Sequence, residues 1–449
     1  MNKTVTQKFL DSIWDFSNRP VPDRVIGQVK NCLIDYMACT VLGASLLSEQ
    51  GREYLDSFGS GEGAISVIGH RTRAPLMQAA MLNGIDAHLI ELDDGHRYAM
   101  LHLGAPVISA LLVTAQDRKL DVSHFIKGII VGYEATVRLA AAIQPGHKLK
   151  GFHATGTCGT IGTALGIAAA LDLPRSYWNT VISAAATDAA GLLQVIDDGS
   201  ELKPYNVGRA VVAAINAAYM GRTGLAGPSD VLGGSRGFFK SMAAEINDSF
   251  LFEGFLPDYA VELIYRKPYA ACRHCHSAIE AALNILRDRQ PDPAQIRRVE
   301  VDTYGLAVKG HDHTAIQGAG SAKMSIPYGV AAALIYGKVN YQQYEADCLD
   351  DRQVKELTGK VTIKEDPVLS GLVPAKRVAV VRVVTPDETF EDRVEYPLGE
   401  PENPMSQEML EEKYFSLMDA AGQDPDLSRQ ILSCIYDLEN QFNHFLDLI

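Results

Sequence analysis

The chain has 449 residues, more than one hydrophobic core usually supports, so two domains are the expected organisation. A formal net charge of −14 argues against nucleic acid and against an anionic membrane surface as partners, because both would repel the protein. Seven scattered cysteines fit a reducing compartment better than a disulfide framework. The first residues hold no signal-peptide core, and the most apolar run, 125–143, is interrupted by charges, so we expect a cytoplasmic protein.

The first half of the chain predicts helices only. Apolar residues at helical spacing mark 3–18 and 22–43, and a run rich in Ala, Leu and Met predicts a helix over 74–92. Asp121 can cap a long helix that reaches about Ile143. Three segments rich in small residues follow, at 156–171, 177–195 and 210–220. Because Ala and Gly let helix axes approach closely, these segments predict a tightly packed bundle.

The pattern changes near residue 295, before which no strand-like alternation occurs. After it, alternating β-branched residues predict strands at 298–308, 359–364 and 376–396. The last of these is a predicted hairpin that turns at Pro386-Asp387. Helical runs at 277–288 and 328–336 are mixed with the strands.

From Ser406, a plausible helix cap, the chain is helical again. The predicted fold class is therefore mainly α, with a large all-helical domain and a smaller inserted α+β domain. The expected boundaries are 1–265 for the helical domain, 266–397 for the α+β domain, and 398–449 for C-terminal helices that return to the helical domain.

Residues 83–106 crowd ionisable side chains between two apolar segments. Seven of them surround Gly95 and Gly104: His88, Glu91, Asp93, Asp94, His96, Arg97 and His102. So many acids and bases are unfavourable in a hydrophobic core and unusual in a linker between domains. They are suited to a site in which protons are transferred. The alternative is an exposed helix end with a solvated acidic turn.

Three other candidate residues lie at predicted helix starts. His153 precedes a small-residue helix, whose N-terminus tends to keep a His neutral, as a general base requires; otherwise it only hydrogen-bonds the turn. Lys203, with free backbone donors nearby, could bind a carboxylate, although most lysines face solvent. Tyr328 follows Ser325 at the start of an apolar helix, where a capping Ser and a packed Tyr are an adequate structural explanation.

The stretch 266–276 combines cations with a CxxC pair. Cys272 and Cys275 have a zinc-ligand spacing, but the nearby candidates for completing four ligands, His311 and His313, lie on a predicted loop. We therefore expect no metal site.

A cluster of cations is the better interpretation of this stretch. It consists of Lys267, Arg273 and the histidines of the stretch, His274 and His276.

Six motifs together resemble the MmgE/PrpD family, which includes 2-methylcitrate dehydratase, cis-aconitate decarboxylase and iminodisuccinate epimerase. They occur in the family's order between about residues 30 and 420: NGIDAHLIELDDGH, HLGAPVISALL, GFHATGTCGTIGTA, LKPYNVGRA, KPYAACRHCHSAIEAAL and AKMSIPYGVAAAL. The resemblance implies a helical domain with an α+β lid, a homodimer, no cofactor, and a small anionic carboxylate as substrate.

The resemblance also implies which residues form the site. The catalytic positions match His102, His153, Lys203, Lys267 and Tyr328, and the substrate-binding positions match Glu91, Asp93, Gly95, Arg273 and His274. Three departures accompany the match: Glu91 stands where Asp is usual, Gly95 replaces a hydroxyl residue, and Leu rather than Pro follows His102.

The chemistry of relatives is proton transfer, or loss of CO2, at a carbon next to a carboxylate. Lys203, Lys267 and Arg273 could offset the carboxylate charge while His102 or His153 moves the proton, with the other or Tyr328 as partner acid. The leading hypothesis is a cofactor-independent lyase of the 2-methylcitrate dehydratase type that acts on a di- or tricarboxylic acid. The alternatives are an epimerase of an imino- or amino-dicarboxylate, a cis-aconitate-type decarboxylase, a metal-dependent hydrolase, and a non-catalytic binding protein.

Overall fold

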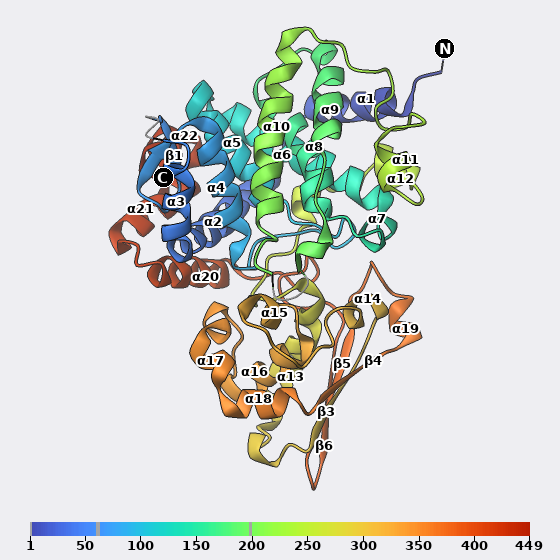
Figure 1. The fold of residues 1–449 in the computed structure, drawn as a ribbon, viewed down its shortest axis with the longest axis vertical. Coiled ribbons are helices and arrows are strands. Elements are labelled where there is room, and N and C mark those ends of the chain that lie inside the picture. The colour runs from blue at the N-terminus through green and yellow to red at the C-terminus, as the bar shows by residue number, and fades with distance from the viewer. Residues whose placement is uncertain (1, 60–62, 197–199) are drawn as a thin grey trace. The chain divides into compact units, whose positions relative to one another are not determined.

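The computed structural model describes residues 2–59, 63–196 and 200–449, which are mainly helical (Figure 1). The chain separates into two compact units. Unit 1 consists of Met1–Gln194, Leu202–Tyr265 and Ser406–Ile449, and unit 2 consists of Val195–Glu201 and Arg266–Met405. The seven cysteines, all of them described, form no disulfide.

Unit 1 is built from helices. They are α1 (Val5–Ser17), α2 (Asp23–Leu46), α3 (Ser48–Asp56), α4 (Leu76–Leu89), α5 (Gly104–Arg118), α6 (Val122–Ile143), α7 (Gly146–Leu149), α8 (Ala154–Ala170), α9 (Trp178–Asp188), α10 (Tyr205–Met220), α11 (Phe238–Met242), α12 (Asp248–Phe252), α20 (Gln407–Ala420), α21 (Pro425–Tyr436) and α22 (Leu438–Leu448). The predicted caps are confirmed, because Asp121 accepts a hydrogen bond from the His124 backbone N–H and Ser406 accepts one from that of Met409.

The core of unit 1 is the close pair α6 and α8, which explains the small residues of this region. A Cβ added to Gly162 would lie 1.9 Å from Thr136 Oγ1, and one added to Gly166 would lie 2.9 Å from the Gly132 Cα. Helix backbones this close leave no room for side chains between them, so the predicted tight packing of small residues is confirmed.

A short hairpin before residue 295 was not predicted. Strands β1 (Ile65–Val67) and β2 (Thr72–Ala74) pair antiparallel, with Ser66 facing Arg73. Three residues per strand are too few to show an alternation of apolar and polar side chains. Two further predictions were too long: the strand expected over 298–308 ends at Thr303, and the helix expected over 177–195 ends at Asp188.

Unit 2 contains a four-stranded mixed sheet in the order β4-β3-β5-β6. Its strands are β3 (Arg298–Thr303), β4 (Val361–Glu365), β5 (Ala379–Val384) and β6 (Thr389–Val394). Strands β3 and β4 are parallel and the other pairs are antiparallel, with Val301 between Ile363 and Val381. The β5–β6 hairpin turns at Pro386-Asp387 as predicted.

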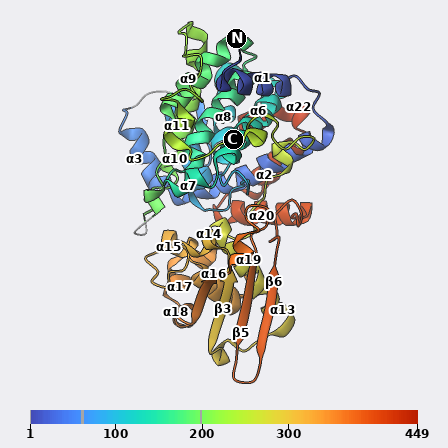
Figure 2. The same cartoon turned by 90° about the vertical axis from the view of Figure 1, so that its right-hand side faces the viewer.

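The helices of unit 2 cover this sheet. They are α13 (His276–Arg289), α14 (Gly305–Val308), α15 (Ala319–Lys323), α16 (Ile326–Tyr336), α17 (Ala346–Asp350), α18 (Arg352–Thr358) and α19 (Pro367–Ser370). Helix α13 packs on β5 and β6, α16 packs on β4, and the two helices pack on each other (Figure 2).

Within the described ranges, no single helix is long and apolar enough to cross a membrane. One bent pair, α2 with α3, passes the same test by length and composition alone, with an angle of 77° between the two helices.

Candidate functional site

The ionisable stretch between α4 and α5 is buried in unit 1. Helix α4 ends at Leu89, Glu91 adopts a left-handed backbone with φ of 58°, and α5 begins at Gly104. His88 is fully buried, and Asp93 is only 3% exposed. The alternative of a solvated acidic turn is therefore wrong.

Asp94 fixes the end of this stretch to α5. Its Oδ1 accepts hydrogen bonds from the backbone N–H groups of Leu103 (3.1 Å) and Gly104 (2.8 Å), while the Tyr133 hydroxyl donates to Oδ2 (2.7 Å). Burial raises the pKa of Asp94 to about 6, although the Gly104 backbone bond opposes this. Asp94 thus fixes the backbone at the start of α5.

Asp93 connects two imidazoles. Its Oδ2 lies 2.7 Å from His88 Nδ1 and 3.1 Å from His102 Nδ1, and the two rings meet edge to face at 4.5 Å. His102 Nδ1 is also 2.8 Å from the Asp94 carbonyl oxygen. Burial would raise the pKa of Asp93, but the facing His102 and His88 hold it well below its usual range.

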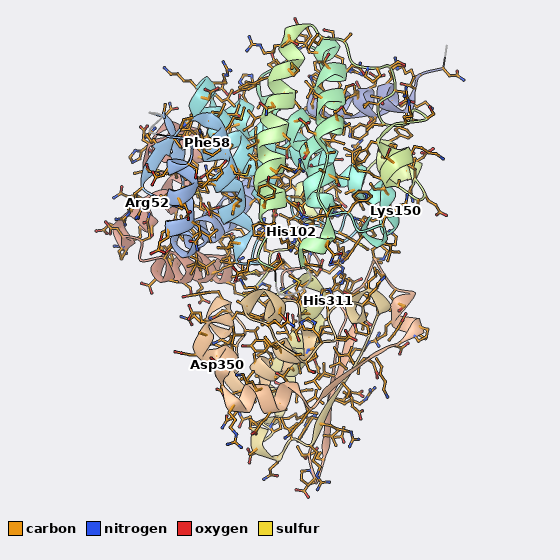
Figure 3. All side chains as sticks on the ribbon, in the orientation of Figure 1. Arg52, Phe58, His102, Lys150, His311 and Asp350 are labelled. Atoms are coloured by element: carbon orange, nitrogen blue, oxygen red, sulfur yellow. The ribbon has the colours of Figure 1, made fainter. Side chains whose placement is uncertain are left out.

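The neighbouring acceptors determine the tautomer of His102. Because the Asp93 carboxylate and the Asp94 carbonyl can only accept, Nδ1 of His102 carries a proton and donates it. In the neutral ring Nε2 then carries no proton and can act only as an acceptor. The backbone N–H of His102 donates to Thr155 Oγ1 (3.1 Å), which ties the residue to α8 (Figure 3 labels His102).

His153 is the N-cap residue of α8 and has the opposite tautomer. Asn206 Nδ2 donates both to the Leu192 carbonyl and to His153 Nδ1, each at 3.3 Å, so the His153 proton is on Nε2. Burial, and then the charge of Lys203, hold the pKa of His153 well below its usual range. The neutral state was predicted, but burial rather than the helix end is its main cause. His153 also stacks on His88, with ring centroids 5.9 Å apart.

Lys203 points at Glu91 and not into solvent. Its Nζ donates to Glu91 Oε1, and the two side chains are 13% and 6% exposed. Glu91 Oε1 is also 3.8 Å from His88 Nε2. The longer Glu at this position therefore provides Lys203 with a counter-ion before any substrate binds.

Gly95 is required by its surroundings. Its backbone forms a bridge with Tyr265, with N···O distances of 3.1 and 2.8 Å. A Cβ on Gly95 would lie 2.4 Å from the Tyr265 hydroxyl oxygen and 2.7 Å from the Leu101 carbonyl oxygen. A hydroxyl residue could not replace Gly95 without a shift of this backbone.

The Asp93 stretch is supported from the C-terminal helices. Lys413 on α20 donates to Asp35 Oδ1 at 2.6 Å and to the carbonyl oxygen of Leu92, the residue before Asp93, at 2.7 Å. The side chains of Lys413 and Asp35 are only 8% and 2% exposed, so this ion pair is internal.

The remaining predicted residues lie in unit 2. Arg273 binds Glu400 Oε1 at 3.0 Å and the carbonyl oxygens of residues 397 and 398. His274 Nδ1 is 2.7 Å from the Tyr304 hydroxyl. The Tyr328 hydroxyl donates to the Gln343 carbonyl, and Lys267 is fully buried.

In the part of the chain that the structure describes, the cysteines and histidines considered as zinc ligands in unit 2 form no group of three within coordinating distance of one another. Cys272 Sγ meets His311 Nε2 at 3.8 Å, but His313 Nε2 faces the Ser321 carbonyl oxygen at 3.0 Å (Figure 3 labels His311). Among the described residues, the one group that brings three possible metal ligands within 4.8 Å is His88, Asp93 and His102. Their contacts are hydrogen bonds from imidazole N–H to carboxylate, which need no ion.

Comparisons with known proteins decide the family. The family model of the MmgE/PrpD N-terminal domain matches residues 7–250, and that of the MmgE/PrpD C-terminal domain matches residues 269–437. The chain belongs to the MmgE/PrpD family.

Several MmgE/PrpD relatives are named enzymes. The cis-aconitate decarboxylase-like protein oryM of Aspergillus oryzae is 28% identical over 95% of this chain and 92% of its own. The cis-aconitate decarboxylase of Homo sapiens is 24% identical over 92% of this chain and 88% of its own. The 2-methylcitrate dehydratase of Escherichia coli O157:H7 is 28% identical over 44% of this chain and 43% of its own.

Two residues of this MmgE/PrpD site were not selected from the sequence. His88 was noted in the ionisable stretch, but nothing in its spacing distinguished it from a core histidine. Asn206 lies in the first turn of α10, three residues after Lys203, which precedes the helix; this short spacing was the available signal.

Proposed function

We propose that this MmgE/PrpD protein is a cofactor-independent lyase that moves a proton at a carbon next to a carboxylate of a di- or tricarboxylic acid. The observation that carries the proposal is the pair of buried imidazoles with opposite tautomers beside Lys203. Neutral His102 has an unprotonated Nε2, whereas His153 keeps its proton on Nε2. Such a pair supplies one base and one acid, which the removal of a proton and a leaving group requires.

In a dehydration, His102 Nε2 takes the proton from the carbon next to the carboxylate. The C–H electron pair forms the new C=C bond while the C–O bond on the neighbouring carbon breaks. The leaving hydroxide takes the Nε2 proton of His153 and departs as water. Asp93 stabilises the imidazolium that His102 becomes, since its carboxylate accepts from Nδ1.

Lys203 is the group that offsets the substrate carboxylate. Proton removal places negative charge beside an existing carboxylate, and one cation about 4 Å away is worth about 4 kcal/mol at an effective dielectric of about 20. Because Lys203 is paired with Glu91, the substrate carboxylate competes with an internal one. We therefore expect substrate binding to separate or share this ion pair.

Decarboxylation is the second candidate. Loss of CO2 leaves an electron pair on the carbon, which takes a proton from the imidazolium form of His102. Water then protonates His102 again for the next turnover. Similarity along nearly the whole chain to two proteins with cis-aconitate decarboxylase names favours it, whereas the named 2-methylcitrate dehydratase of E. coli O157:H7 matches less than half of the chain.

We also propose that Lys267 and Tyr328 act in turnover, and that Arg273 and His274 take part in substrate binding, as the resemblance to the family implies. In unit 2 Arg273 already holds Glu400, so its contribution to binding includes keeping that loop in place. Kinetics of Lys267→Met and Tyr328→Phe test the first part, since each removes one polar group with little change of volume.

Proton NMR in deuterated buffer tests the proposed function, with 2-methylcitrate, citrate, cis-aconitate and iminodisuccinate as candidate substrates. A new alkene signal with loss of an α-proton would support a dehydratase, and a new methylene signal with CO2 release would support a decarboxylase. Deuterium entry without a new carbon skeleton would indicate an epimerase and contradict a lyase. No reaction from folded protein with any of these acids would contradict the proposal.

Matched variants assign the activity to this site. His153→Ala and Lys203→Ala should each lower kcat by at least about 10²-fold. The controls are His124→Ala, an exposed histidine bonded to Asp121, and Lys30→Ala, the partner of the exposed Glu439. Both controls should keep wild-type kcat. Wild-type activity in the His153 or Lys203 variant would remove that residue from the mechanism.

A further inference from the structure

We propose that His88 is a positioning residue that shares the Asp93 carboxylate with His102 and thereby lowers the proton affinity of His102. The catalytic meaning of this inference rests on the proposed function. The pKa of His102 can be measured without any substrate.

The geometry gives His88 the closer contact with Asp93. His88 lies in the last turn of α4 and is fully buried. Its Nδ1 is 2.7 Å from Asp93 Oδ2, against 3.1 Å for His102 Nδ1 and the same oxygen. Asp93 Oδ1 has no hydrogen-bond partner among the described residues. One carboxylate oxygen therefore receives both imidazole donors, and the shorter bond goes to His88.

Sharing one oxygen weakens each bond. A carboxylate that already accepts a hydrogen bond offers less negative charge to a second donor on the same oxygen. The imidazolium of His102 depends on that charge more than the neutral ring does. His88 thus makes His102 harder to protonate, which keeps a larger fraction of its Nε2 available as a base near neutral pH.

Removal of His88 should change the pKa of His102 in the same direction whether His88 is neutral or charged. A neutral His88 competes for the oxygen, and a charged His88 would also repel the His102 imidazolium. Removal of His88 therefore raises the pKa of His102 in both cases. The two routes differ in what an uncharged donor at position 88 would do, and this difference makes the proposal testable.

Other ionisable groups surround the pair but are common to wild type and variant. Those that face it from the neighbouring elements are Asp35 and Lys413, which support the stretch, and Glu91, Asp94, Tyr133, His153 and Lys203. They set the absolute pKa of His102 and cancel in a comparison between variants, provided that the fold is unchanged.

Within the described part of the chain, the bond to Asp93 is the side-chain hydrogen bond of His88 that a substitution would remove. Its Nε2 has no hydrogen-bond partner among the described residues and is 3.8 Å from Glu91 Oε1. His88→Phe keeps the planar ring and removes the donor. His88→Asn places an uncharged N–H close to the position of Nδ1 and restores the bond to Asp93.

The test is a histidine NMR titration of the full-length protein labelled with ¹⁵N-histidine, with His102→Gln to assign the His102 signals. We expect the pKa of His102 to rise by about one pH unit in His88→Phe, a tenfold change in proton affinity, and to stay near wild type in His88→Asn. Circular dichroism confirms the fold of each variant.

Two outcomes would overturn the inference. An unchanged pKa of His102 in folded His88→Phe would mean that His88 only fills space. An equal rise in both variants would mean that charge on His88, and not the shared hydrogen bond, acts on His102. With an active substrate, the acid limb of the kcat/KM profile should move to higher pH by the same amount in His88→Phe alone. Failure of every substrate would leave the NMR titration interpretable.

Discussion

Glu91 combines two unusual features in one residue. Its left-handed backbone costs about 1–2 kcal/mol for a residue with a side chain, and its carboxylate forms an ion pair with Lys203, the residue that we propose binds the substrate carboxylate. A shorter Asp would reach less far toward Lys203. We interpret Glu91 as a residue that controls which carboxylates can bind, since a substrate must compete with it.

Glu91→Gln should strengthen the binding of anionic ligands. The substitution keeps the length and removes the competing charge, so we expect the Kd for citrate, measured by calorimetry, to fall about tenfold, or about 1.4 kcal/mol. Glu439→Gln, which neutralises the exposed partner of Lys30, is the control and should leave the Kd unchanged. Weaker binding by the Glu91 variant would contradict competition at Lys203.

Gly95 should tolerate no side chain. Gly95→Ala places a methyl group against the Tyr265 hydroxyl and the Leu101 backbone, so we expect a loss of about 1–3 kcal/mol in the free energy of unfolding, measured by urea denaturation. Gly27→Ala is the control, because nothing lies within 4 Å of a Cβ at this helical position. It should gain up to about 1 kcal/mol. Equal stability of the two variants would exclude the clash.

At the scale of elements, the β1–β2 hairpin depends on α4. Asn83 on α4 accepts from the Ile68 N–H at 2.9 Å and donates to the Ser66 carbonyl oxygen at 3.1 Å. His70, in the turn of the hairpin, meets the fully buried Asp86 one helical turn further along α4, at 3.0 Å. The hairpin is thus stabilised by side chains distant in sequence, which strand propensity does not report.

Asp86 should make this junction sensitive to pH. Burial raises its pKa to about 6, although His70 opposes this, against 3.8 for an ordinary Asp. A carboxyl whose folded-state pKa is raised contributes stability below pH 3.8, and this contribution is lost as the pH rises through about 6.

Asp86→Asn has no ionisable carboxyl at this position, so the variant does not lose stability as Asp86 ionises. The variant should therefore gain stability relative to wild type between about pH 4 and pH 7, by up to about 3 kcal/mol for a shift of about two units. Chemical denaturation at several pH values measures the difference. Asp419→Asn, at an exposed position of α20, is the control and should show no pH-dependent difference. A pH-independent effect of Asp86→Asn would show that Asp86 is ionised throughout this range.

At the scale of the whole molecule, unit 2 has its own internal ion pair. Arg273 and Glu400 are 3% and 2% exposed in their side chains, and Arg273 also binds two backbone carbonyls. Breaking a buried pair leaves an uncompensated charge, which typically costs about 3–5 kcal/mol.

Arg273→Met should therefore loosen unit 2 selectively. We expect faster amide hydrogen exchange, followed by mass spectrometry, in peptides from 266–405 and unchanged exchange in α6 and α8 of unit 1. Arg352→Met is the control, because its bond to Glu356 is an exposed pair of one helix in unit 2. Uniformly faster exchange in both units would instead show that the chain opens as one cooperative body.

Much of the fold was predictable because local patterns specify it. The caps at Asp121 and Ser406 and the turn at Pro386-Asp387 depend on a few neighbouring residues. The β1–β2 hairpin and the Gly95–Tyr265 bridge were not predictable, since each depends on residues remote in sequence.

The candidate site was also predictable only in part. Residue types and order pointed to His102, His153 and Lys203, which unit 1 brings into one cluster. The sequence could not show that Lys203 is already paired with Glu91, because a pairing across 112 residues leaves no local pattern. For the same reason it could not show that one oxygen of Asp93 serves two histidines.

The bond from Lys413 to the Leu92 carbonyl also has a consequence for synthesis on the ribosome. About 320 residues separate Asp93 from Lys413, and at about 5–20 residues per second they take roughly 15 to 60 s to translate. During that interval the stretch around Asp93 lacks the hydrogen bond from Lys413, and Asp35 lacks its cation. The first helices therefore reach their final contacts only after α20 has been synthesised. A chain whose synthesis stalls within residues 266–405 cannot complete the candidate site.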